Sequence, residues 1–170
     1  MGKFSTLINL TRINKPIGIF LLLWPTLSAL WLASEGIPNM KILAIFILGT
    51  ILMRSAGCVV NDLADRNLDC FVERTKSRPI TSGLVSLKGA LILSLVLIIF
   101  SFMLVIQLNS LTIYIACFAL IFSLTYPLTK RFFAIPQLYL GITFGFGVLM
   151  AFSAVQNKIP IEALFLFISN

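Results

Sequence analysis

Long apolar runs alternate with short polar segments along the whole chain. Five runs approach the roughly 20 residues that a helix needs to cross a bilayer core of about 30 Å. They cover residues 17–33, 42–60, 90–108, 111–128 and 135–155. Pro16 and Pro136 stand where a helix tolerates proline, in its first turn, and Pro25 should kink the first run. The pattern predicts an all-α membrane protein, a multi-span helical bundle with five complete transmembrane helices.

A sixth apolar run begins at Ile161, and the sequence stops at Asn170 after too few residues to cross. A bilayer does not accept a partial span whose helix end lies in hydrocarbon. We therefore interpret residues 1–170 as the N-terminal part of a single, longer transmembrane domain, either as a fragment or as a natural truncation.

Composition excludes an ordinary soluble domain, because 59% of the residues are hydrophobic and only 11% are charged. The chain has no histidine, which excludes histidine catalysis and histidine metal sites. The spacing of Cys58, Cys70 and Cys117 fits neither a zinc site nor a redox pair. We interpret the three cysteines as packing residues.

The cations are distributed unevenly between the two sides of the predicted bundle. Ten of them lie in the N-terminal segment and in the loops after the second and fourth runs, against Lys41 and Lys158 on the other side. The positive-inside rule places the ten in the cytoplasm. Orientation in a lipid bilayer explains the net charge of +7 better than nucleic-acid binding does, so no nucleic-acid partner is expected.

Four of the six acidic residues follow the second run directly. On a helix, Asn61, Asp62, Asp65 and Asp69 fall within one arc of about a third of a turn. Three carboxylates and an amide oxygen on one face suit Mg²⁺ whose coordination is completed by substrate phosphates. The alternative is a solvated helix extension in which aspartates and arginines pair at the surface.

Arg54 lies in the second run, seven residues before Asn61 and on nearly the same helix face. An ionisable residue in a membrane span indicates a function by default, because its burial is costly. Arg54 could hold an anion beneath the metal, or it could form an internal salt bridge with one of the aspartates.

Tyr126 and Lys130 are four residues apart at the end of the fourth run. On a helical turn both would point the same way, which suits phosphate oxygens. Taken alone, the pair is also typical of interfacial anchors.

Gly141, Gly145 and Gly147 in the fifth run include a GxxxG spacing. Such spacing is typical of a face where two helices pack closely in a membrane. We expect a helix-packing surface there.

The stretch GCVVNDLADRNLD, with the following RTKSRPITSG, resembles the first aspartate-rich motif of the UbiA superfamily of intramembrane prenyltransferases. The segments RINKPIGIFLLLWPTLSALW, MRSAGCVVND and TYPLTKRFFAIPQLYLGITFGFGVLMAF extend the resemblance over nearly all 170 residues. The resemblance implies a nine-helix fold around a cavity that opens sideways to lipid. This chain would supply five of those helices and the start of the sixth.

The resemblance also implies roles for individual residues. The metal-binding positions would be Asn61, Asp65 and Asp69 with Asp62 beside them, and the diphosphate-binding positions would be Arg54, Arg66, Tyr126 and Lys130. Arg54 and Lys130 would stabilise the charge that grows on the leaving diphosphate. A second aspartate-rich motif is expected after the sixth helix and does not occur within these residues, so we expect little transfer activity from residues 1–170 alone.

The implied activity is Mg²⁺-dependent transfer of a polyprenyl chain from polyprenyl diphosphate to 4-hydroxybenzoate, a step of ubiquinone biosynthesis, with no obligate protein partner. The enzyme would lie in a bacterial or mitochondrial inner membrane, with the motif loops on the cytoplasmic or matrix side. Other UbiA branches prenylate homogentisate, naphthoate or porphyrin acceptors, and an inactive fragment is a further alternative. A transporter would place its acids at mid-membrane. Acids at the membrane boundary beside basic residues favour phosphate capture instead.

Overall fold

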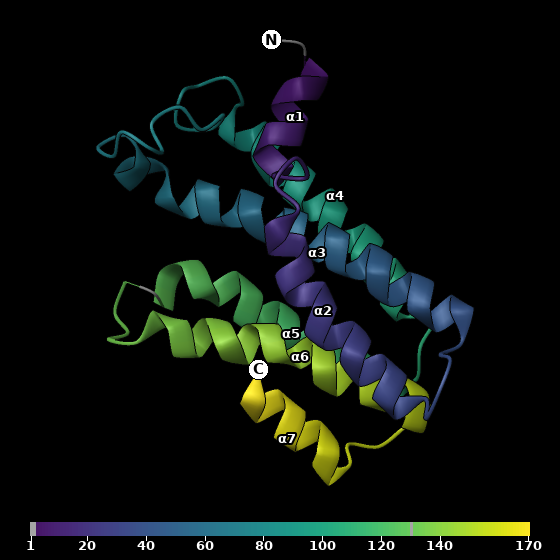
Figure 1. The fold of residues 1–170 in the computed structure, drawn as a ribbon. Helices are drawn as coiled ribbons and strands as arrows, with labels where there is room; N and C mark the ends of the chain where they lie inside the picture. Colours follow the sequence, from purple (N-terminus) through teal and green to yellow (C-terminus); the bar gives the residue numbers. More distant parts are fainter. Residues whose placement is uncertain (1–2, 130) are drawn as a thin grey trace.

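The computed structural model describes residues 3–129 and 131–170, and helices are the regular elements of this part (Figure 1). They are α1 (Lys3–Thr11), α2 (Ile17–Ala33), α3 (Met40–Asp69), α4 (Leu87–Val105), α5 (Ser110–Thr129), α6 (Pro136–Gln156) and α7 (Ile161–Ser169). The predicted all-α architecture is thus confirmed.

Four helices, α3 to α6, are long and apolar enough to cross a membrane. The remaining predicted span, α2, has the expected bounds and is apolar, but it has 17 residues and falls just short of that length. Pro25 lies inside α2 and does not end it. All five predicted runs thus form described helices, of which four have the length of a membrane span and α2 is slightly shorter.

The helices form two packed pairs that α2 joins. Helix α3 packs most extensively on α4, and α5 packs on α6, while α2 contacts both α6 and α3 (Figure 1). Leu30, Phe46, Val148 and Phe152 belong to the buried cluster where α2, α3 and α6 meet. Many large apolar side chains point outward, Trp24 at 69% exposure among them. Such a surface suits lipid better than water.

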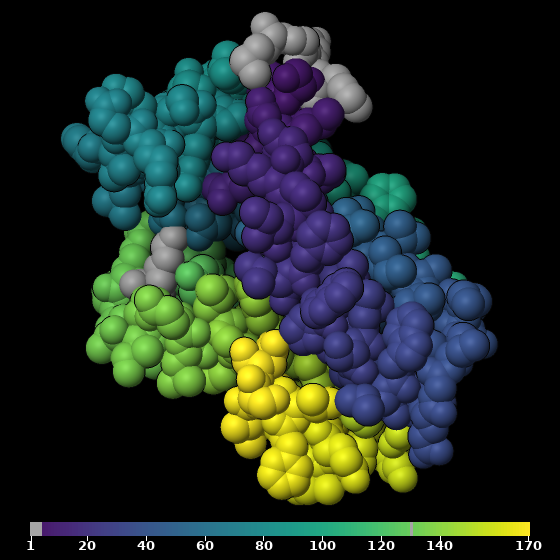
Figure 2. Space-filling model, viewed as in Figure 1, coloured from purple at the N-terminus to yellow at the C-terminus, as the bar shows by residue number. Residues whose placement is uncertain are grey.

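The pattern of apolar runs did not predict helix α1. Its Leu10 is fully buried in a cluster with Val59, Ile80 and Ala90. The nine residues of α1 are too few and too mixed in polarity to resemble a span, so its packing emerges only in three dimensions. In Figure 2 the purple N-terminal residues run down one face of the molecule, beside the teal segment that follows α3.

The glycines of α6 allow close contacts with two different helices. A Cβ atom at Gly147 would overlap Thr26 Oγ1 of α2, and one at Gly145 would lie 2.6 Å from the Phe167 ring of α7. A Cβ atom at Gly141 would meet nothing within 4 Å. The close-packing surface is therefore made by Gly145 and Gly147, and the GxxxG pair does not act as one unit.

The three cysteines have free thiols and differ in burial. Cys58 is buried, whereas Cys70 and Cys117 are exposed. The prediction that all three are packing residues is confirmed for Cys58 and wrong for the other two.

Candidate functional site

A cavity of about 600 Å³ lies among α2, α3, α4, α5 and α6. Its polar end is lined by Arg12, Arg54, Asn61, Asp65, Asp69, Arg74, Thr75, Arg78 and Tyr126. The remainder is largely apolar and includes Phe46, Val105, Phe144 and Met150. A cavity of this kind fits an amphiphile with a compact anionic head and a long apolar tail.

Helix α3 contributes one continuous stripe to the cavity wall. Its lining residues recur every three or four positions: Ile45, Phe46, Gly49, Thr50, Met53, Arg54, Gly57, Cys58, Asn61, Asp65 and Asp69. At 1.5 Å per residue the stripe is about 36 Å long. Along this stripe, which winds around the helix, the lining changes from apolar at Ile45 to polar at Asp69.

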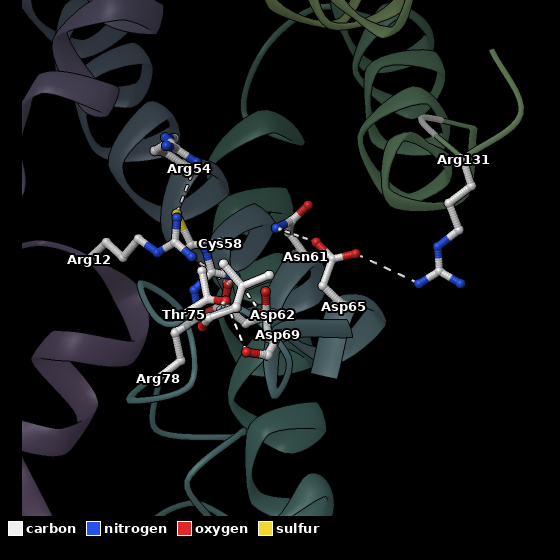
Figure 3. Close-up of polar contacts among 11 residues, drawn as sticks. Arg12, Arg54, Cys58, Asn61, Asp62, Asp65, Asp69, Thr75, Arg78 and Arg131 are labelled. Atoms are coloured by element: carbon white, nitrogen blue, oxygen red, sulfur yellow. Dashed lines mark hydrogen bonds and ion pairs between the residues drawn. The ribbon is translucent and has the colours of Figure 1, made fainter. Parts of the chain in front are cut away.

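Asp62 is excluded from this stripe, although it lies beside the other motif residues in the sequence. It is 1% exposed and does not line the cavity. Its Oδ1 forms an ion pair with Arg12 and a second one with Arg78 Nη1 at 3.1 Å (Figure 3). Both arginines do line the cavity, so the carboxylate stands behind two guanidinium groups.

The segment after α3 folds back over the end of that helix. Arg78 Nη1 lies 2.6 Å from Asp69 Oδ2, in addition to its contact with Asp62. The buried Thr75 hydroxyl donates a hydrogen bond of 3.0 Å to the backbone carbonyl of Asp69. These contacts place the Thr75 and Arg78 side chains at the polar end of the cavity, next to the last turn of α3.

Asp65 lies on the other flank, toward α5. Asn61 Nδ2 donates a hydrogen bond of 3.2 Å to Asp65 Oδ2, and Arg131 Nη2 lies 3.7 Å from Asp65 Oδ1 (Figure 3). Arg131 also donates a 2.6 Å hydrogen bond to the carbonyl of Ala64. The segment after α5 is thereby attached to α3 at the polar end.

Arg54 lies deeper along the same stripe. It is half-buried, and its Nη1 donates a hydrogen bond of 2.9 Å to Cys58 Sγ. Its guanidinium also lies against Gly18 of α2. Of the two sequence-based alternatives, this arrangement agrees with a cation lining the cavity, since the bond goes to a thiol and not to an aspartate.

The remaining predicted site residues have different positions. Tyr126 lines the cavity. Arg66 is exposed, donates to the carbonyl of Leu63 at 3.2 Å and does not line the cavity. Lys130 lies outside the described residues.

The donor chemistry of the stripe fits a hard divalent cation. Asn61, Asp65 and Asp69 all line the cavity and offer the oxygen ligands that Mg²⁺ prefers. Within residues 3–129 and 131–170, no three His, Cys, Asp or Glu side chains are gathered closely enough to form a metal cluster by themselves. A metal here would therefore need oxygens from the amide, from water or from a phosphate ligand.

Three arginines of the site were missed as functional residues by the sequence analysis. Arg12 and Arg131 were among the cations that set the membrane orientation, and Arg78 was considered in addition only as part of the basic run after the acidic stretch. Each contacts an aspartate of α3. Only the position of Arg78 shortly after the acidic stretch could have signalled this, because Arg12 is 50 residues from Asp62.

Comparison with sequence families gives a match to the UbiA prenyltransferase family over residues 22–170. A 4-hydroxybenzoate octaprenyltransferase of Herminiimonas arsenicoxydans is 56% identical over 170 residues. A second, from Methylobacillus flagellatus, is 55% identical over 168 residues. These alignments cover 100% and 99% of this chain, and 60% and 57% of the relatives. The chain thus spans about three fifths of the length of the curated relatives that it matches.

Solved structures give the same fold. Digeranylgeranylglyceryl phosphate synthase aligns with a TM-score of 0.82 at 22% identity, over 98% of this chain and 58% of that one. An apo UbiA homologue from Aeropyrum pernix K1 has a TM-score of 0.74 at 29% identity, over 88% and 55%. A UbiA homologue from Archaeoglobus fulgidus bound to DMAPP and Mg²⁺ has a TM-score of 0.76 at 16% identity, over 96% and 59%.

Proposed function

The chain belongs to the UbiA prenyltransferase family, and we propose that it forms the diphosphate-binding part of a membrane enzyme that transfers a polyprenyl chain to 4-hydroxybenzoate. The observation that carries this proposal is the cavity, in which four arginines and the oxygen donors of α3 occupy one end and apolar side chains the rest. A polyprenyl diphosphate has the same division between an anionic head and an apolar tail.

The polar end supplies the charge that the reaction needs. When the allylic C–O bond breaks, the diphosphate takes the electron pair and gains negative charge, and the prenyl fragment becomes a cation. Arg54, Arg74 and Arg78 line the region where that negative charge would develop. Fixed cations in a cavity of low dielectric stabilise such charge more than water does.

Asn61, Asp65 and Asp69 are the residues that would hold Mg²⁺, which when bound supplies positive charge to the diphosphate oxygens. The apolar remainder of the cavity would hold the chain and keep water from the allylic cation until a ring carbon of the acceptor attacks it. The C–H bond at that carbon then breaks, and its proton passes to the released diphosphate or to water. Tyr126, which lines the polar end, would donate a hydrogen bond to a phosphate oxygen.

The names of the relatives support the donor and the acceptor. Both are 4-hydroxybenzoate octaprenyltransferases, so a long polyprenyl diphosphate is the proposed donor and 4-hydroxybenzoate the proposed acceptor. Homogentisate, naphthoate and porphyrin remain the competing acceptors. We place the enzyme in an inner membrane with the polar end of the cavity on the cytoplasmic or matrix side, because the cations gather there.

The test is a transfer assay with the complete protein that contains residues 1–170, using labelled octaprenyl diphosphate, Mg²⁺ and each aromatic acceptor in turn. We expect transfer to 4-hydroxybenzoate, and loss of at least 100-fold (roughly 3 kcal/mol of barrier) in Asp65→Asn and Asp69→Asn. Glu73→Gln is the matched control, because Glu73 pairs with Lys76 at the surface. Transfer that is independent of Mg²⁺, or faster to another acceptor, would contradict the proposal.

A further inference from the structure

Asp62 is the one aspartate of the acidic stretch on α3 that turns away from the cavity. We propose that Asp62 is a positioning residue: it holds Arg12 and Arg78 at the polar end of the cavity, where they meet the diphosphate, and it does not bind the metal. This inference rests on the proposed function, since it names how two of the diphosphate-facing cations are kept in place.

The burial of Asp62 requires its two partners. A carboxylate that is 1% exposed loses its hydration, and this loss is tolerated only when cations and hydrogen-bond donors replace the water. Arg12 and Arg78 provide these cations and donors. Arg12 precedes α2 in the sequence, and Arg78 follows α3. The side chain therefore has its charge matched without a metal.

The position of Asp62 relative to the cavity separates it from the proposed metal ligands. Asn61, Asp65 and Asp69 line the cavity, whereas Asp62 does not. A metal that bridges the diphosphate to Asp62 would have to replace both guanidinium groups. Arg12 and Arg78, by contrast, contact Asp62 and line the cavity at the same time.

The two arginines lie in connecting segments, whose neighbouring residues Leu10 and Ile80 pack in a buried cluster with Val59 of α3. Arg12 occupies the corner between α1 and α2 with a backbone φ of +55°, a left-handed conformation that costs free energy for any residue except glycine. Arg78 lies in the long connection between α3 and α4 and bridges Asp62 to Asp69. Asp62 thus adds to this packing a charged contact between α3 and each arginine.

Attachment matters because an arginine side chain has many rotamers. A guanidinium that is already held in place before the ligand arrives loses less conformational freedom on binding a phosphate. Replacing Asp62 by asparagine keeps the size of the side chain and removes the charge that orders both arginines. We expect prenyl diphosphate to bind about tenfold more weakly, as for the loss of one charge-assisted interaction.

The experiment measures binding of geranyl diphosphate to the complete protein in lipid nanodiscs over a series of Mg²⁺ concentrations. Asp62→Asn should weaken binding about tenfold and leave the half-maximal Mg²⁺ concentration unchanged. Asp65→Asn should instead raise the Mg²⁺ concentration that is needed. Glu73→Gln, a carboxylate-to-amide change away from the cavity, should alter neither quantity.

A mutant cycle adds a test of the coupling. If Asp62 acts through Arg12 and Arg78, then Asp62→Asn should weaken binding no more than about twofold in a protein that already carries both Arg12→Ala and Arg78→Ala. Hydrogen exchange of the ligand-free protein should also show faster exchange in residues 12–16 and 74–80 of Asp62→Asn, because these segments lose their charged contacts with α3.

A rise in the Mg²⁺ requirement of Asp62→Asn equal to that of Asp65→Asn would overturn the proposal and make Asp62 a metal ligand. The proposal would also be overturned if the effects of Asp62→Asn and of the arginine substitutions on affinity were fully additive, or if Asp62→Asn left the affinity unchanged. Other outcomes would refute the proposed function, and they can be distinguished from these. Geranyl diphosphate binding with transfer to another acceptor refutes only the acceptor, whereas a wild-type protein that binds no prenyl diphosphate refutes both.

Discussion

Gly18 of α2 and Arg54 of α3 lie in direct contact: a Cβ atom at position 18 would be 2.6 Å from Arg54 Nη2 and 2.8 Å from Nε. The absence of a side chain at position 18 is what leaves room for the guanidinium. Arg54 lines the main cavity and also a smaller one of about 260 Å³ beside it. The contact therefore fixes the position of the Arg54 guanidinium between the two cavities.

Gly18→Ala should displace the Arg54 guanidinium, because the flexible end of that side chain is easier to move than either helix backbone. We expect a three- to tenfold loss of prenyl diphosphate affinity (roughly 1 kcal/mol) with little change in thermal stability. Gly141→Ala is the control, since a Cβ atom there meets nothing within 4 Å. Equal affinities of the two variants would show that the position of Arg54 does not matter for binding.

Gly147→Ala should separate α2 from α6. Its Cβ atom would overlap Thr26 Oγ1, and Thr26 is buried at 4% exposure with its hydroxyl bonded to the carbonyl of Leu22. Overpacking of this kind costs about 1–3 kcal/mol. Thermal unfolding in detergent measures the loss, and adding Thr26→Ala should recover most of it by removing the overlapping oxygen. If the second substitution recovered nothing, the overlap would not be the cause.

Asn109→Ala should loosen the attachment of α5 to α6. Asn109 Nδ2 donates to the carbonyl of Ser153 at 2.6 Å, and its Oδ1 accepts from both the backbone and the hydroxyl of Thr112. The Thr112 and Ser153 hydroxyls are buried and 2.8 Å apart, so their network would lose its central member. We expect destabilisation of about 2 kcal/mol. Gln107→Ala, which removes only an exposed hydrogen bond, should leave the unfolding temperature unchanged.

Cysteines placed at the two ends of α3 should react from opposite sides of the membrane. Lys41 lies in the first turn of this helix and Lys76 lies beyond its last residue, and both are exposed. In a background without the native cysteines, a membrane-impermeant maleimide added outside should label Lys41→Cys, and Lys76→Cys should need permeabilised membranes. Labelling of both from one side would refute the orientation.

Much of the fold could be predicted from the sequence because the bilayer imposes the length and the apolar character of each helix. The predicted run at residues 17–33 coincides with α2, and the predicted run at 135–155 differs from α6 by one residue at each end. Helix α1 was missed because it depends on the contacts of Leu10 with Val59 and Ile80, which no local pattern reveals.

The sequence predicted the helix face that carries the candidate site, but it did not predict which residues of that face line the cavity. Helical spacing correctly put Asn61, Asp62, Asp65 and Asp69 on neighbouring positions of one helix, yet an arc of a third of a turn is wide enough for its edges to meet different surroundings. Residues on one side of the arc line the cavity, whereas Asp62 on its edge forms ion pairs with Arg12 and Arg78. Which edge faces the cavity depends on segments distant in sequence, so the spacing alone could not separate Asp62 from the rest.

The unbroken stripe of α3 has a consequence for how a bound molecule is aligned. Its 30 residues contain no proline, so the positions of Asp69, Arg54 and Phe46 along the helix axis are fixed relative to one another. A prenyl diphosphate bound with its head group at the polar end would therefore extend along α3 toward Ile45, and each isoprene unit would lie beside a defined part of the helix. If this chain binds a prenyl diphosphate as we propose, we expect residues near Ile45, and not those that contact the head group, to discriminate between chains of different length.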